Sequence, residues 1–239
     1  MELKYFSFVA VFVGVALSAP TELLSEPDRR IVNGTDTTIN NFPFMVSLRG
    51  MYGDHMCGGS ILSELWILTA AHCPRAARVD NFGSDYNPDN SHINDIALLK
   101  LYDPLQFSAQ VSRARLPQSF SEITDPNDLG VTLIGWGLTA TGGYVPKTLQ
   151  RVDYYIVPNA QCAAIHRYPI YPSHICAATP GGGKGQCSGD SGGPLLHHGV
   201  QLGIVSWSVK PCAIAPYPGV LTKVSHHIAF IEQYTSVLH

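Results

Sequence analysis

Short apolar runs separated by turn residues make up most of the chain from about residue 42 onward. Their length and their richness in β-branched and aromatic residues predict strands. Gly, Pro, Asn and Asp fill the breaks, and the 22 glycines and 17 prolines favour many short strands over long helices. The predicted strands lie at 44–48, 66–68, 96–101, 131–134, 152–157, 202–205 and 220–224. Near the end, Ile228, Ile231 and Tyr234 recur at helical spacing, so residues 225–234 are predicted to form a helix.

The first residues have the order of a secretory signal. A short polar start is followed by an apolar run over residues 5–17, and Ala16 and Ser18 supply small residues for cleavage. The run is shorter than the roughly 20 residues that a membrane span needs. We therefore expect a signal peptide over residues 1–18, a secreted protein and no membrane partner.

Residues 19–30 are polar, contain no cysteine and end in Arg29-Arg30, and a more apolar region starts at Ile31. This change in composition predicts a removable pro-segment over residues 19–30 and a folded domain over residues 31–239. A disordered N-terminal arm fits the composition equally well.

Charge and cysteine content narrow the class of protein further. The formal net charge is -3, so no basic excess indicates a nucleic-acid partner. The six cysteines are an even number, which in an oxidising compartment suggests three disulfides, but spacing alone does not choose the pairing. The absence of a CxxC motif argues against a zinc site, so no metal is expected.

Three local motifs carry the candidate chemistry. Residues 68–73 read LTAAHC, residues 94–101 read NDIALLKL and residues 185–195 read GQCSGDSGGPL. Each motif alone is ordinary, but together they supply His72, Asp95 and Ser191 in one of the chain orders known for the Ser-His-Asp triad. A serine hydroxyl needs an adjacent base, so His72 is the expected base for the nucleophile Ser191, and Asp95 is expected to orient His72.

With these motifs in register, the sequence resembles the trypsin/chymotrypsin-like serine proteases, closest to the chymotrypsin-like branch with three disulfides. RIVNG at 30–34, CGGS at 57–60, GWG at 135–137, SW at 206–207 and PGV at 218–220 match as well, so the resemblance covers residues 31–239. It implies an all-β fold of two packed six-stranded antiparallel Greek-key barrels, with a C-terminal helix and the active site between the barrels. It implies a hydrolase that acts through an acyl-enzyme on protein or peptide substrates without a cofactor. Protein inhibitors are further expected partners.

The resemblance also assigns an oxyanion hole and an activation step. The backbone N–H groups of Gly189 and Ser191 would form the oxyanion hole. Cutting between Arg30 and Ile31 would free an ammonium that is buried and pairs with Asp190, so the precursor is expected to be a zymogen that needs a trypsin-like activating protease. The implied disulfides are Cys57–Cys73, Cys162–Cys176 and Cys187–Cys212.

The resemblance places Gly185, Ser206, Ser208 and Gly219 around the substrate pocket. Trypsin-like selection of Lys or Arg would need an Asp at position 185, where this chain has Gly. The uncharged slot predicts a chymotrypsin-like preference for large apolar or aromatic residues. Ser208 is bulkier than the usual Gly and Gln186 adds polarity, so an elastase-like preference for smaller residues is the alternative.

One segment departs from the family pattern. Asp95 follows His72 by only 23 residues, about half the spacing of related enzymes. The first barrel is therefore expected to be shortened, with residues 78–79 as its remaining strand, and the calcium loop of some relatives would be lost. The protein is then an active enzyme, a catalytically silent homologue that binds a partner, or an incomplete sequence. The intact triad argues against the silent homologue.

Overall fold

The computed structural model describes residues 31–74, 81–83, 85–119 and 129–235. The expected signal peptide, the expected pro-segment and the strand expected at residues 78–79 lie outside these ranges. Within them, no helix has both the length and the apolar character needed to cross a membrane.

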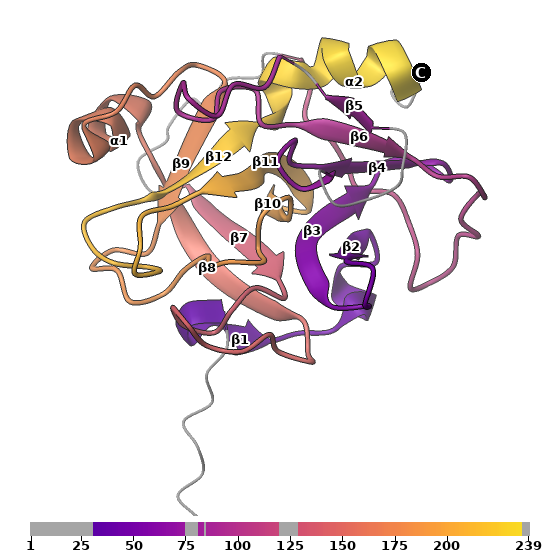
Figure 1. Cartoon of the computed structure of the whole chain (residues 1–239), viewed down its shortest axis with the longest axis horizontal. Helices are drawn as coiled ribbons and strands as arrows, with labels where there is room; N and C mark the ends of the chain where they lie inside the picture. Colours follow the sequence, from indigo (N-terminus) through magenta and orange to yellow (C-terminus); the bar gives the residue numbers. More distant parts are fainter. Residues whose placement is uncertain (1–30, 75–80, 84, 120–128, 236–239) are drawn as a thin grey trace, which may run out of the picture.

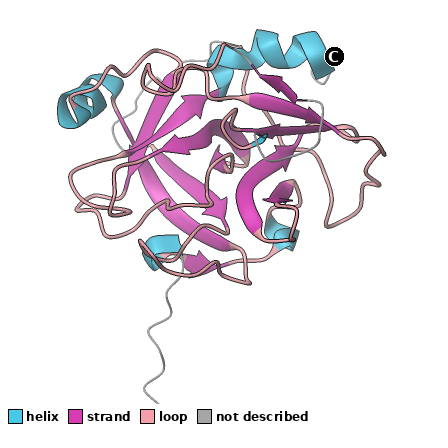
Figure 2. Ribbon diagram, in the orientation of Figure 1, coloured by secondary structure: helices cyan, strands magenta, loops and turns pink. Residues whose placement is uncertain are grey.

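The second half of the chain forms a closed antiparallel barrel of six strands (Figures 1 and 2). The ring runs β8-β7-β10-β11-β12-β9 and closes because β9 also pairs with the end of β8. The short strand β1 pairs with the first two residues of β8. Burial alternates along β8, where Val152, Tyr154 and Ile156 point into the core, as the two-residue period of a strand requires. The strands are β1 (Thr35–Asp36), β7 (Gly130–Gly135), β8 (Gln150–Val157), β9 (His174–Ala178), β10 (Pro194–His197), β11 (Val200–Trp207) and β12 (Gly219–Lys223).

The first half forms a separate antiparallel sheet in the order β2-β3-β4-β6-β5, and its described strands do not close into a ring. The short strand β5 lies between β4 and β6 in the sequence. In the sheet it pairs with β6 and forms the edge. The shortened first barrel expected from the sequence is therefore present. The strands are β2 (Met45–Arg49), β3 (His55–Ile61), β4 (Trp66–Thr69), β5 (Asn81–Gly83) and β6 (Ala97–Lys100).

The predicted C-terminal helix is present as α2 (Ile228–Thr235), preceded by a 3-10 turn at Val224–His227. Ile228 and Ile231 are buried against Leu62 and Leu68 of the first half, so this helix joins the two halves (Figure 1). Further short helices, which the sequence pattern did not predict, are α1 (Asn159–His166) and 3-10 turns at Ile31–Asn33 and Ile39–Asn41.

The strand β3 was also missed, because its two central glycines are poor strand formers. Tertiary packing explains them. A Cβ on Gly58 would lie 2.9 Å from the Cα of Gly193, so this part of β3 presses directly on the segment that follows Ser191. The same contact places the first half of the chain against the candidate nucleophile.

Candidate active site

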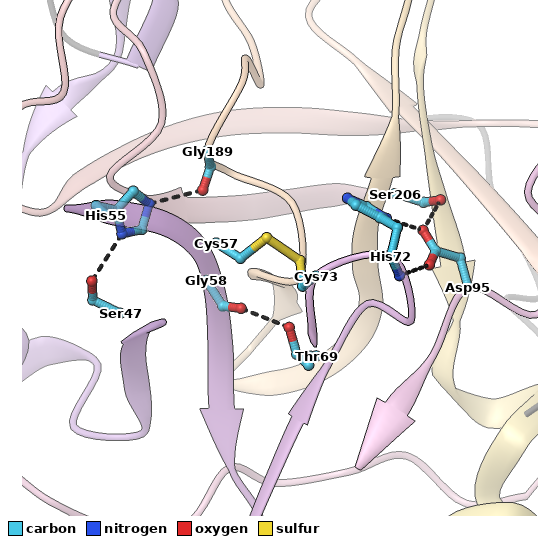
Figure 3. Close-up of a disulfide and its surroundings, with 10 residues drawn as sticks. All are labelled: Ser47, His55, Cys57, Gly58, Thr69, His72, Cys73, Asp95, Gly189 and Ser206. Atoms are coloured by element: carbon cyan, nitrogen blue, oxygen red, sulfur yellow. Dashed lines mark hydrogen bonds and ion pairs between the residues drawn. A yellow bond between two sulfur atoms is a disulfide. The ribbon is translucent and has the colours of Figure 1, made fainter. Parts of the chain in front are cut away.

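The three disulfides pair as the resemblance implied. The bonds are Cys57–Cys73, Cys162–Cys176 and Cys187–Cys212. The first ties β3 to the residue that follows His72 (Figure 3). The third ties the segment before Ser191 to the segment after β11.

His72 and Asp95 meet at one end of the first sheet. Thr69 at the end of β4 pairs with Ala97 at the start of β6, which brings the residues just beyond the two strands together. The Nδ1 of His72 lies 2.7 Å from Oδ2 of Asp95, and the backbone N–H of His72 donates to Oδ1 at 3.0 Å (Figure 3). The short connection between the two residues therefore does not prevent their pairing.

Asp95 is fully buried and its other contacts come from the second barrel. The hydroxyl of Ser206 donates to Oδ2 at 2.6 Å (Figure 3). The hydroxyl of Thr222 donates to the backbone carbonyl of Asp95 at 2.8 Å. The family resemblance places Ser206 at the substrate pocket, whereas its hydroxyl binds the carboxylate that pairs with His72.

The shortened connection is held by side chains of the second barrel. Ser91, His92 and Asn94 all have positive φ values, which residues with a side chain rarely adopt. The indole N–H of Trp207 donates to the carbonyl of Ser91 at 3.1 Å, and the hydroxyl of Tyr171 lies 2.6 Å from Oδ1 of Asn90. These bonds hold the unfavourable conformation that delivers Asp95 to His72.

The Ser191 segment packs on the end of β4. Gly192 has a φ of +79°, and a Cβ there would lie 2.2 Å from Oγ1 of Thr69, so no other residue fits. The backbone N–H of Gly58 donates to the carbonyl of Ser191 at 2.8 Å. Ser191 is half-buried, and among the described residues no hydrogen bond joins its hydroxyl to His72. Catalytic hydrogen bonds are often long without substrate, so this geometry is compatible with a nucleophile and its base.

His55 supports the same segment and was not found in the sequence analysis. Its Nε2 lies 2.9 Å from the carbonyl oxygen of Gly189, and its Nδ1 lies 2.8 Å from the hydroxyl of Ser47 (Figure 3). Burial is the main cause that lowers the pKa of His55. The neutral ring therefore fixes the peptide between Gly189 and Asp190 without bringing a charge to it.

Asp190 is a buried carboxylate that lacks an ion pair within the described part of the chain. The backbone N–H groups of Gly137 and Cys187 donate to its two oxygens at 2.8 Å. Burial raises its pKa to about 7, against the opposing effect of these bonds and of Lys210. Ile31 is fully buried, and the carbonyl of the next residue accepts the N–H of Gly185.

The pocket-forming segments surround a cavity of about 690 Å³. Gln186, Ser208 and Gly219 line it, and Lys184 is the charged residue among the described lining residues. Gly185 lies against Tyr154, whose hydroxyl accepts the backbone N–H of Gln186 at 2.6 Å. Of the pocket residues expected from the sequence, Ser208 and Gly219 thus line this cavity, whereas Gly185 and Ser206 are not among its described lining residues.

Comparison with known proteins agrees with this geometry. The family model described as Trypsin matches residues 31–231. A "Vitellin-degrading protease" of Bombyx mori is 39% identical over 89% of this chain and 88% of its own length. "Trypsin alpha-4" of Lucilia cuprina is 36% identical over 90% of this chain and 91% of its own, and "Anionic trypsin" of Canis lupus familiaris is 35% identical over 94% and 95%. The chain therefore belongs to the trypsin family of serine endopeptidases.

Proposed function

We propose that this endopeptidase works through the triad Ser191, His72 and Asp95. The observation that supports the proposal is the pairing of His72 with a buried, fully hydrogen-bonded Asp95 in spite of the short connection. With Nδ1 bound to the carboxylate, Nε2 is the nitrogen left to accept a proton.

In the proposed reaction, Ser191 Oγ forms a bond to the substrate carbonyl carbon while its proton moves to His72 Nε2. The carbonyl oxygen becomes an oxyanion, for which the N–H groups of Gly189 and Ser191 are the proposed donors. The C–N bond then breaks and the proton passes to the leaving amine, which leaves an acyl-enzyme. Water repeats the two steps, giving the carboxylic acid and restoring the serine hydroxyl.

Secretion and activation belong to the same proposal. Residues 1–18 are proposed as signal peptide and residues 19–30 as pro-segment, with a trypsin-like protease cutting after Arg30. The burial of both Ile31 and Asp190 supports this, because a buried ammonium at Ile31 would give the buried carboxylate the cation that it lacks.

A secreted homologue without activity, acting as a binding protein, is the alternative. Treating purified, trypsin-activated protein with a fluorophosphonate and locating the adduct by mass spectrometry separates the two. We expect one adduct on Ser191, and no adduct on Ser191→Ala. Folded protein that is cut after Arg30 and stays unlabelled would support the binding protein instead.

The proposed specificity is for uncharged residues, as in chymotrypsin-like enzymes. The relatives named trypsin do not indicate specificity for Lys or Arg in this chain. Position 185 is Gly, and no acidic residue is among the described residues that line the pocket. On sequence alone, the side-chain-free positions Gly185 and Gly219 favour a large apolar or aromatic residue. The size that the pocket accepts then depends on how much of it the side chain of Gln186 fills.

Replacing Gly185 with Asp is not expected to create cleavage after Lys or Arg. A Cβ at this position would lie 2.5 Å from the hydroxyl oxygen of Tyr154, so the variant must shift β8 or the pocket segment and lose thermal stability. The matched variant Gly185→Asp/Tyr154→Phe removes that oxygen, and we expect its Tm to exceed that of the single variant. Efficient cleavage after Arg by the single variant would contradict this account.

Ser206→Ala is expected to lower kcat about tenfold with little change in KM. The variant loses the bond to Oδ2 of Asp95, and a hydrogen bond to a charged group is worth about 1.5–3 kcal/mol. Ser208→Ala is the matched control, since Ser208 lines the pocket and is expected to affect KM instead. Steady-state kinetics on one peptide substrate measure both, and a pure KM effect for Ser206→Ala would assign Ser206 to the substrate pocket after all.

A further inference from the structure

The side chain of Gln186 lies between two segments that the family resemblance places around the substrate pocket. Its Nε2 donates to the backbone carbonyl of Trp207 at 3.0 Å, so the amide links the segment before Ser191 to the end of β11. The residue is only 3% exposed. The bond therefore joins two pocket-forming segments across the space between them.

The same amide covers the glycine at the start of β12. A Cβ on Gly219 would lie 2.4 Å from Oε1 and 2.7 Å from Cδ of Gln186. Non-bonded carbon atoms prefer separations of about 3.5–4.0 Å, so no ring can lie between the amide and Gly219. The space that the absent side chain of Gly219 leaves open is occupied by the carboxamide.

The orientation of this amide follows from its partner. The carbonyl of Trp207 accepts hydrogen bonds only, so the NH₂ group of Gln186 must face it and the oxygen must face away. That oxygen is buried and has no hydrogen-bond partner among the residues that the structure describes. An unpaired buried acceptor costs about 1–3 kcal/mol, which a ligand bearing a donor would recover.

We propose that Gln186 determines specificity by closing the pocket to aromatic side chains and selecting short side chains that donate a hydrogen bond, such as Thr, Ser and Asn. The proposal rests on the proposed endopeptidase function and replaces its preference for large residues. The bridge between Gln186 and Trp207 limits the length of the accepted side chain, and Oε1 selects a donor at its tip.

Peptide substrates that differ only in the residue before the scissile bond test the proposal, with Ala, Thr, Asn, Phe and Lys at that position. For the parent enzyme we expect kcat/KM for Asn and Thr to exceed the values for Ala and Phe about tenfold. Gln186→Ala opens the slot, so Phe is expected to gain at least tenfold relative to Ala while the advantage of Asn disappears. Gln186→Leu still fills the slot but has no acceptor, so Phe stays poor and Asn loses its advantage.

Titration with a fluorophosphonate gives the concentration of active sites for each variant, so a fraction that fails to fold does not distort the ratios. A parent enzyme that cleaves best after Phe, or a Gln186→Ala variant with unchanged ratios, would overturn the role of Gln186. Failure of the endopeptidase function itself has a different signature, because the parent enzyme would then form no adduct at all.

Discussion

Replacing Asp95 with Asn is expected to lower kcat about ten thousand-fold. In the parent, both carboxylate oxygens accept hydrogen bonds, from His72 Nδ1, the His72 backbone N–H and the hydroxyl of Ser206. Asparagine has one oxygen and one NH₂ group, so at least one of the His72 and Ser206 donors must face the NH₂ group, which is itself a donor. When the NH₂ group of Asn faces Nδ1 of His72, Nδ1 must act as the acceptor and the ring proton lies on Nε2 instead. A protonated Nε2 no longer accepts the proton of Ser191.

The measurement is kcat on a peptide substrate together with the rate of labelling of Ser191 by a fluorophosphonate. Ser191→Ala gives the floor of the assay. The fold is expected to survive, because Thr222 binds the backbone of Asp95 and not its side chain. Near-normal kcat in a folded Asp95→Asn variant would mean that Asp95 does not orient the catalytic base in this protein.

Replacing Asp190 with Asn in the activated enzyme is expected to lower kcat/KM between about a hundredfold and several thousandfold. In the proposed mature form, the ammonium of Ile31 is buried against this carboxylate. Removing one partner of a buried ion pair costs about 3–5 kcal/mol, and each 1.36 kcal/mol corresponds to a factor of ten. The ordered Gly189–Ser191 segment is then no longer the favoured conformation, so labelling of Ser191 is expected to slow in parallel.

In the uncut chain, ionisation of Asp190 is expected to lower the free energy of unfolding. Burial raises the pKa of Asp190 to about 7, above its ordinary value near 4. The unfolded chain therefore releases this proton at lower pH than the folded chain, and the stability of the fold falls as the pH rises from about 4 to about 7. The free energy of unfolding is lowered by at most about 4 kcal/mol, and this contribution no longer changes above about pH 7.

Urea unfolding of Arg30→Gln, which trypsin does not cut at this site, measures the effect at pH 4.5 and pH 7.5. The control is Arg30→Gln/Asp190→Asn, which has no carboxyl group to ionise. We expect the single variant to lose more stability than the double variant between the two pH values. Equal losses would show that Asp190 ionises without penalty in the uncut chain.

Residue type and spacing were sufficient to predict the features that depend on local chemistry. The triad residues were predicted because a nucleophile needs a base and His72, Asp95 and Ser191 occur in a known order. An uncharged pocket was predicted from Gly185 and stays a prediction, whereas the C-terminal helix predicted from the spacing of Ile228 and Ile231 is present. The disulfide pairing came from the resemblance to the family.

Contacts between distant residues were decided only by the tertiary structure. Ser206 is 111 residues from Asp95 and His55 is 134 residues from Gly189, so no local pattern indicates either hydrogen bond. The strand β3 was missed because Gly58 weakens a strand on its own and is required only by the close approach of Gly193. The position of the Gln186 amide likewise depends on the backbone of β11 and β12, which meet it only in the folded chain. Sequence thus determined which groups are present, and the fold determined which of them touch, because hydrogen bonds and packing act over distances of a few ångströms.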